Sequence, residues 1–222
     1  MYILTRTGGL EKSEDKIFRV KADELDTEYR HAGYQRRERS YKIVYQYTEY
    51  IVICPEYRND DLGGEPIVII PEFLLPRRPY MAYVYLYAID LYSAMPEKGQ
   101  RWAAEATRKK FKLPTFAHTT LGRALKSFVR STKETHKACE AQSGLAVESA
   151  GQPNAEAAEN GGYDNGKAIP ACIPTAGTTK ELRTAAAGVL GGRIAGASLE
   201  KIIEYTLEMA MSWFLEHRRL LL

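Results

Sequence analysis

Residues 79–133, PYMAYVYLYAIDLYSAMPEKGQRWAAEATRKKFKLPTFAHTTLGRALKSFVRSTK, carry the clearest structural pattern in the chain and decide the expected fold. Apolar residues recur at helical spacing over 80–95, 100–112 and about 118–132, and prolines and glycines separate these three segments. Pro79 fits the first turn of the first helix, where its missing N–H costs nothing. The stretch therefore predicts a unit of three helices.

The part of the chain before this unit has the composition of a small β-sheet. Twelve of the fifteen tyrosines lie in residues 29–92, and Tyr, Val and Ile dominate residues 41–53. These side chains favour strands, although Tyr also suits interfaces and base stacking. A strand over 41–53, a Gly-containing turn and a strand over 66–70 predict an antiparallel hairpin, with a weaker strand signal at 17–20. We expect residues 1–76 to form a small, Tyr-rich antiparallel sheet.

The segment after the three helices changes composition twice. Residues 138–179 are rich in Ala, Gly, Asn, Pro and Glu, and have too few bulky apolar side chains to offset the entropy of ordering, so they predict a flexible linker. Helical patterns return over 180–190 and about 198–219. The apolar arc of the last helix is so wide that it needs cover, from this chain or from another subunit. The expected organisation is an α+β chain with a β-rich part at 1–76, a three-helix unit at 77–137, a linker at 138–179 and C-terminal helices at 180–222.

The charge of the chain is concentrated in one window. Residues 99–137 hold ten Lys and Arg against two acids, Glu105 and Glu134, so the window has a net charge of +8 while the whole chain has +3. Ion pairs within the helices cannot neutralise such an excess. Concentrated positive charge on a helix pair indicates a phosphate backbone as the partner. An acidic protein surface and mere solubility are the alternative explanations.

The stretch at residues 116–125, FAHTTLGRAL, resembles the helix-turn-helix of bacterial transposases and recombinases. In their common pattern a Ser or Thr and an apolar residue open the recognition helix, and Arg and Leu follow; Thr120, Leu121, Arg123 and Leu125 match it. The sequence departs from the pattern in three places: a Ser cap is replaced by Ala117, a Gly turn by Pro114-Thr115, and Gly122 lies inside the helix.

A wider resemblance covers residues 1–135. The run Ile70–Tyr80, followed by a helix and then the helix-turn-helix pattern, is similar to an uncharacterised bacterial family often found with mobile elements. Its members join a zinc-ribbon-like N-terminal part to a helix-turn-helix, and two C-x-x-C knuckles would fall near residues 4–7 and 54–57. Of the four cysteines that these two knuckles require, only Cys54 is present. One thiolate cannot form a site that needs four ligands, so the resemblance implies the strands of the ribbon without its metal.

The candidate DNA-binding residues follow from the helical spacing of the basic window. The outer face of the third helix would enter the groove, because Arg can pair with guanine and Thr can contact bases or phosphates. The second helix would contact the sugar–phosphate backbone, and His118 would start the third helix near a phosphate. The groove-facing candidates are Thr119, Arg123, Lys126 and Arg130, and the backbone candidates are Arg101, Lys109, Lys110 and Lys112.

Signals for catalysis, cofactors and membranes are weak or missing. No glycine cluster has the spacing of a phosphate-binding loop, and the four histidines show no metal-binding spacing. Three cysteines at unrelated spacings predict a reducing, cytoplasmic setting rather than a disulfide framework. No long apolar run predicts a membrane span, and the start of the chain lacks the pattern of a signal peptide. We expect no enzymatic activity, no metal and no cofactor.

The sequence therefore predicts a protein that binds double-stranded DNA, for a mobile element or as a regulator. The rival hypothesis is a structural or interaction module that assembles, for example as a homo-oligomer, through its C-terminal amphipathic helix and places the basic helices on an acidic partner. A third hypothesis, a decayed copy of a mobile element, would explain the missing cysteines.

Overall fold

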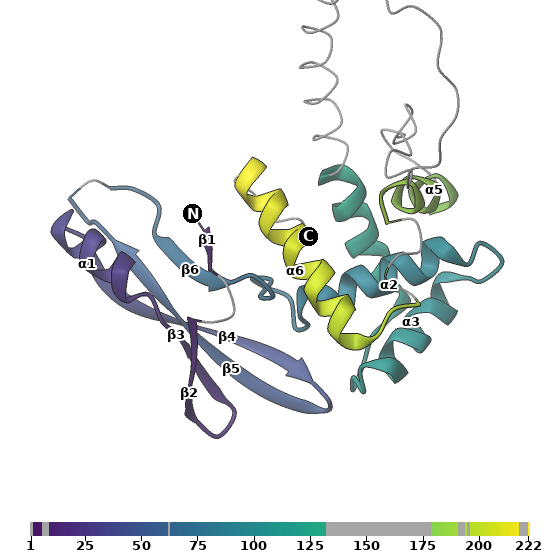
Figure 1. Ribbon diagram of the computed structural model, residues 1–222, viewed down its shortest axis with the longest axis horizontal. Helices are drawn as coiled ribbons and strands as arrows, with labels where there is room; N and C mark the ends of the chain where they lie inside the picture. The colour runs from purple at the N-terminus through teal and green to yellow at the C-terminus, as the bar shows by residue number, and fades with distance from the viewer. Residues whose placement is uncertain are drawn as a thin grey trace, which may run out of the picture.

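The computed structural model describes residues 2–5, 9–61, 63–131, 179–190, 194, 196–217 and 222. These residues have an α+β fold, in which a curled mixed sheet lies beside a cluster of helices (Figure 1). The strands are β1 (Tyr2–Thr5), β2 (Leu10–Glu14), β3 (Ile17–Val20), β4 (Gln35–Tyr45), β5 (Thr48–Arg58) and β6 (Ile67–Pro71). The helices are α1 (Asp23–His31), α2 (Ala82–Ala94), α3 (Gln100–Lys110), a helix over residues 118–131, α5 (Thr179–Leu190) and α6 (Leu199–His217).

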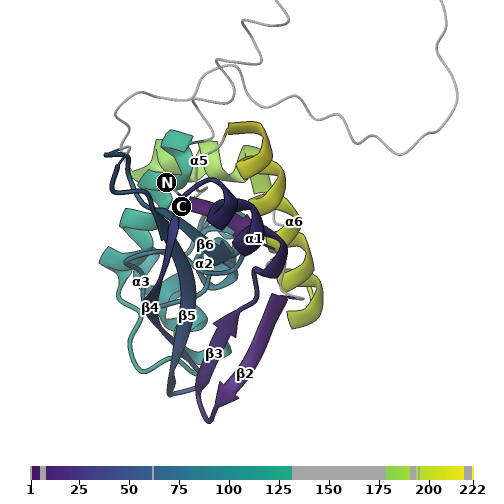
Figure 2. The ribbon, with the colours of Figure 1, turned by 90° about the vertical axis from the view of Figure 1, so that its left-hand side faces the viewer.

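β5 is the strand that connects the whole sheet. β4 pairs with it antiparallel along its full length. Two strands share the opposite edge of β5. β3 runs parallel to residues 51–53 of β5, and β6 runs antiparallel to residues 56–57. β2 extends the β3 branch (Figure 2), and β1 extends the β6 branch (Figure 1). The sheet therefore divides into two branches beyond β5.

The expected small antiparallel sheet is wrong. The sheet has six strands, and its β1–β6 and β3–β5 pairings are parallel. Parallel partners are joined by long crossovers, so no local sequence pattern reveals them. Residues 41–53 are not one strand either, because the chain turns at residues 46–47 between β4 and β5. The expected antiparallel pairing of the strand at 66–70 is confirmed by the Glu56–Val68 pair.

The turn between β4 and β5 has an unusual backbone. Gln46 and Tyr47 have φ angles of 46° and 61°, which place both residues in the left-handed region. A two-residue hairpin turn of this kind matches the twist of the strands, but it favours Asn-Gly because a Cβ atom costs roughly 1 kcal/mol there. The Tyr47 N–H donates a 2.8 Å hydrogen bond to the Lys112 carbonyl oxygen. The hairpin tip is thus attached to the turn that follows α3.

α2 lies at the centre of the helical cluster. Twelve of its thirteen residues are buried, and a helix that is apolar all round is typical of one enclosed by other elements. The neighbours of α2 include α3, α5 and α6. The helix expected over residues 80–95 is confirmed, but its tyrosines, including Tyr83, Tyr85 and Tyr87, belong to this helical core and not to the sheet.

The C-terminal helices are joined to the helical core through Arg183 on α5. Its guanidinium donates hydrogen bonds of 2.6 Å to the carbonyl oxygens of Pro96 and Lys98, in the loop between α2 and α3. It also lies 3.8 Å from the centroid of the Tyr92 ring on α2. Fully buried Asp90 accepts a 2.7 Å hydrogen bond from the Ile194 N–H, between α5 and α6. The linker expected over 138–179 lies outside the described residues, apart from Thr179.

α1 is held to the sheet by one carboxylate. Asp26 accepts a 3.0 Å hydrogen bond from the hydroxyl of fully buried Tyr57, and pairs with Arg30 and Arg36. Burial, followed by the hydrogen bond to Asp26, raises the pKa of Tyr57 to about 12. The helix has no fully buried side chain of its own, so this network and the contact of Tyr29 with Tyr57 fix its position.

Among the described residues, no helix combines the length and the apolar character that crossing a bilayer requires.

Candidate nucleic-acid interface

α3 and the helix over 118–131 form the candidate interface, and their inner faces are apolar. Ala103 and Ala104 on α3 are buried, as are Leu121, Leu125 and Phe128 on the second helix. The bounds of the two helices agree with those expected from the sequence, 100–112 and 118–132, except that α3 ends at residue 110.

Steric crowding does not explain the presence of Gly122 inside the helix. A Cβ atom built at this position would lie 3.6 Å from the Gln100 side-chain oxygen, which is an ordinary contact. The glycine is therefore not required for the helices to approach each other.

A well-formed cap ends α3 and begins the turn. The Leu113 N–H donates to the Arg108 carbonyl at 3.0 Å, and the Lys112 N–H donates to the Lys109 carbonyl at 3.3 Å. These two bonds form a Schellman motif, in which the residue after the C-cap is left-handed and is usually glycine. Lys112, with φ of 49°, occupies that position. A strained lysine therefore stands at the position where glycine is usual. The resemblance places this departure at Pro114-Thr115 alone.

Two aromatic side chains of the turn fix it to α2. The Phe111 ring lies 5.8 Å from Tyr83 and 5.2 Å from Tyr87, measured between ring centroids. The Phe116 ring lies 5.6 Å from Tyr80 and 5.9 Å from Tyr85. Both contacts bury the phenylalanines and leave the intervening polar residues outside. The core thereby holds the start of the helix over 118–131 in a fixed place.

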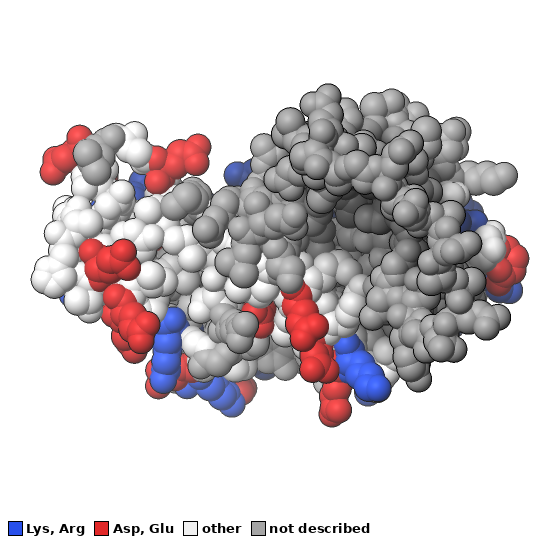
Figure 3. All heavy atoms as spheres, turned by 45° about the horizontal axis from the view of Figure 1, so that its top comes forward, with Lys and Arg blue, Asp and Glu red and all other residues white. Residues whose placement is uncertain are grey.

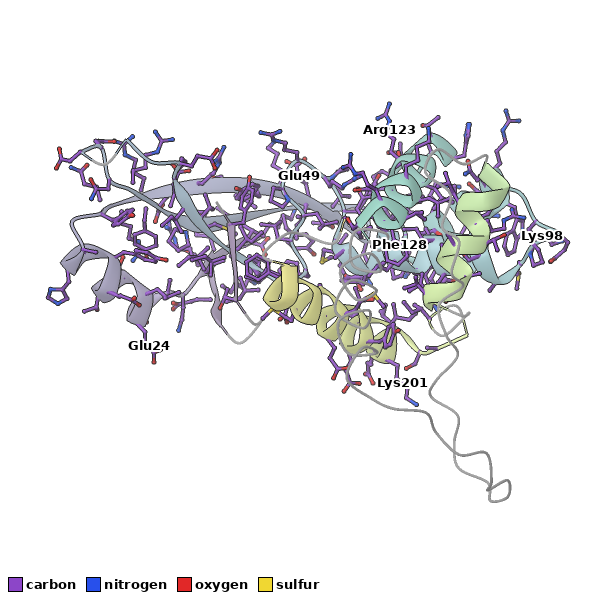
Figure 4. All side chains as sticks on the ribbon, turned by 90° about the horizontal axis from the view of Figure 1, so that it is seen from above. Glu24, Glu49, Lys98, Arg123, Phe128 and Lys201 are labelled. Atoms are coloured by element: carbon purple, nitrogen blue, oxygen red, sulfur yellow. The ribbon has the colours of Figure 1, made fainter. Side chains whose placement is uncertain are left out.

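All nine residues proposed from the sequence to contact DNA are exposed to solvent. On the helix over 118–131, the four groove-facing candidates follow a spacing of four, three and four residues, which places them on one face. Figure 4 shows Arg123 pointing away from the helical core, on the side opposite Lys201 of α6. The exposed set is Arg101, Lys109, Lys110, Lys112, His118, Thr119, Arg123, Lys126 and Arg130.

The positive charge of this surface is only slightly neutralised. Residues 99–131 hold eight Lys and Arg and one acid, Glu105. The Glu105 carboxylate accepts hydrogen bonds of 2.8 and 2.9 Å from Arg108 and lies 3.6 Å from the Lys109 ammonium. The hydrogen bond from Arg108 is the main cause that lowers the pKa of Glu105. Within the described residues, no carboxylate forms an ion pair with the other six basic side chains: Arg101, Lys110, Lys112, Arg123, Lys126 and Arg130.

The side of the molecule that carries α6 has a different character. Glu200, Glu204 and Glu208 follow one another at intervals of one helical turn on α6, and all three are exposed. Figure 3 shows acidic side chains gathered over this helix, with basic ones beside them. The described surface therefore has a basic side at α3 and the 118–131 helix and a mixed side at α6.

Leu4 and Cys54, the first residues of the two places where the resemblance would put zinc-binding knuckles, belong to the apolar core. Leu4 on β1 is buried, and Cys54 on β5 is fully buried. Burial raises the pKa of the Cys54 thiol to about 12, whereas a zinc ligand must be a thiolate. Among the described residues, no group of three or more His, Cys, Asp or Glu side chains is arranged to hold a metal ion.

We expect Cys54 to resist alkylation by iodoacetamide at pH 8 in the native protein. The thiol is buried and stays protonated there, and only the thiolate reacts. Unfolding in urea should expose it and lower its pKa toward the ordinary value. Mass spectrometry of the peptide containing Cys54, before and after unfolding, measures this protection. Rapid labelling in the native protein would contradict it.

Sequence reasoning missed two exposed aromatic residues at the basic surface, Trp102 on α3 and the more exposed Tyr47. Tyr47, at the tip of the β4–β5 hairpin, is 65% exposed. The only signal was a Gln-Tyr pair inside a run of Tyr, Val and Ile, and neither residue marks a turn.

Comparisons with protein-family models, curated proteins and solved structures found no match.

Proposed function

We propose that the protein binds double-stranded DNA through the exposed basic side of α3 and the helix over 118–131. The observation that carries this proposal is the surplus of positive charge: six exposed Lys and Arg side chains without a carboxylate partner among the described residues. Clustered cations gain most from a polyanion, because their contacts release the counterions condensed on the phosphates. The similarity of residues 116–125 to a transposase-type helix-turn-helix supports the same proposal.

The proposed complex assigns different contacts to the two helices. Thr119, Arg123, Lys126 and Arg130 follow one face of a helix about 20 Å long, which suits a major groove. Arg101, Lys109, Lys110 and Lys112 come from α3 and its cap and would contact phosphates. His118 would contact a phosphate at the start of the helix over 118–131. Binding alone, without a metal, a cofactor or catalysis, is what we propose, in a mobile-element or regulatory role in the cytoplasm.

The rival proposal, assembly through the C-terminal helix, gains no specific support. α6 packs on α2, and Ile202, Thr206, Ala210 and Phe214 are buried along one side of it. Much of its apolar arc is therefore covered by the chain itself. The exposed glutamates of α6 would also face an incoming second copy of this helix and repel it.

Binding to a duplex of random sequence should fall steeply with salt. If six phosphates are contacted, the affinity should drop about 1,000-fold between roughly 50 and 200 mM monovalent salt. Fluorescence anisotropy of a labelled duplex, titrated at several salt concentrations, gives the slope of log K against log salt. An acidic protein of similar charge is the matched competitor. No binding of the duplex at the lowest salt would overturn the proposal.

A further inference from the structure

The tip of the β4–β5 hairpin lies next to the proposed DNA-binding surface. The Tyr47 N–H donates to the Lys112 carbonyl, which joins the tip to the turn between α3 and the 118–131 helix. The pKa of Arg108 is raised mainly by its hydrogen bond to Glu105 and, to a smaller degree, by Tyr47, so the tyrosine side chain lies near α3 as well. The Tyr47 side chain therefore lies near Arg108, and its backbone is bonded to that of Lys112.

The residue types at this tip do not serve the turn. Both Gln46 and Tyr47 have positive φ angles, a conformation that glycine or asparagine adopts more easily. The Tyr47 side chain is 65% exposed and so adds little to the core. Strained residues that persist without a packing role point to a function at the surface.

Charged groups on the hairpin itself do not compete for the same partner. Lys42 on β4 and Glu49 on β5 are diagonal neighbours in the antiparallel register and form an ion pair of 3.0 Å. Figure 4 shows Glu49 on the same side of the molecule as Arg123. The charge of Glu49 is thus compensated, whereas Lys112, whose carbonyl accepts the bond from Tyr47, has no carboxylate partner among the described residues.

We propose that the hairpin tip is a second DNA contact, in which Tyr47 packs its ring on a deoxyribose and donates its hydroxyl to a phosphate next to the one bound by Lys112. This inference rests on the proposed function and extends the interface beyond the two helices. Tyr side chains commonly bond phosphate oxygens and fix the register of a protein on the duplex. The backbone bond between Tyr47 and Lys112 keeps the two contacts at a constant spacing, so they can bind neighbouring phosphates of one strand.

The test compares three variants on one labelled duplex of about 20 base pairs, two helical turns. Tyr47→Gly removes the side chain and relieves the backbone, so it should raise Tm while weakening binding more than about tenfold, because both the ring contact and the hydrogen bond are lost. Tyr47→Phe keeps the ring and should weaken binding about tenfold, the effect of one lost hydrogen bond to a charged group. Lys112→Gln keeps the strained backbone and should lower the salt slope by about 1, which neither Tyr47 variant should do.

Gln46→Asn is the matched control for strain. Asparagine tolerates a positive φ, so this variant should also raise Tm, but it leaves the Tyr47 side chain in place and should bind like the wild type. Wild-type affinity in Tyr47→Gly, with the wild type binding normally, would overturn the hairpin contact and leave the proposed function intact. A wild-type protein that does not bind the duplex would overturn the proposed function itself.

Discussion

Replacing Arg123, Lys126 and Arg130 together with glutamine is expected to weaken binding to duplex DNA about 100-fold at roughly 50 mM salt. These three side chains lie on one exposed helix face, and no carboxylate pairs with them among the described residues. The slope of log K against log salt should also fall, although by less than the roughly 2.7 that three lost phosphate contacts would give, because these side chains face the groove. Glutamine has nearly the helix propensity of Lys and Arg, so helicity measured by circular dichroism should not change.

Single variants should separate the two kinds of contact within this surface. Arg123→Ala should lose discrimination among sequences, since Arg123 is the groove-facing arginine nearest the start of the helix. Lys110→Ala should weaken all sequences alike and flatten the salt slope by about 1. A binding selection against random duplexes, followed by titration of selected and scrambled sites, measures the difference. Equal losses on both sites in both variants would contradict the assignment of roles.

Two control variants bracket the effect of charge. Lys201→Gln removes one exposed positive charge from α6, on the side opposite Arg123, and should leave the affinity within about twofold because exposed charges beyond a Debye length are screened. Glu105→Gln releases Arg108 and Lys109 from their ion pairs and should tighten binding. If the triple variant bound like Lys201→Gln, the basic face would not be the interface.

The helices were predictable because their ends are marked in the sequence. Pro96 and Gly99 separate α2 from α3, and Pro114 follows the cap of α3, so periodic segments between them could be located to within a few residues. The nine exposed candidates of the interface followed from the same periodicity. Exposure and charge depend on the local sequence and could be predicted from it. Contact with DNA depends on a second molecule, so it stays a prediction.

The sheet was less predictable because its order depends on long-range pairing. β2 is polar, with sequence LEKSE, and among the described strands it pairs with β3 alone. α1 has no buried side chain, and its position depends on the network of Asp26 with Tyr57 and Arg36. The hairpin turn at Gln46 and Tyr47 lacks the Gly or Asn that identifies such turns. Tertiary contacts determine the position of all three elements, and the propensities of single residues do not predict such contacts.

Replacing Arg183 with alanine is expected to reduce the free energy of unfolding by about 3 kcal/mol. The variant loses two hydrogen bonds to the carbonyl oxygens of Pro96 and Lys98 and the contact of the guanidinium with Tyr92. Arg183→Lys keeps the positive charge but lacks the planar fork and its stacking on Tyr92, and should cost about 2 kcal/mol. Urea unfolding followed by circular dichroism measures both values, with exposed Lys201→Ala as a control expected to stay within about 0.5 kcal/mol.

The form of the unfolding curve distinguishes two consequences of this loss. If α5 and α6 are an integral part of the core around α2, Arg183→Ala should lower the urea midpoint of a single transition without changing its slope. If the C-terminal helices unfold separately, a second transition should appear and the remaining part should keep its midpoint. The buried hydrogen bond from the Ile194 N–H to Asp90 favours the first outcome, since the opening of α5 and α6 would leave that carboxylate exposed beside the apolar surface of α2. A Tyr92→Leu variant, combined with Arg183→Ala in a double-mutant cycle, should show a coupling of about 1 kcal/mol, and a coupling near zero would mean that the ring contact adds nothing to the two carbonyl bonds.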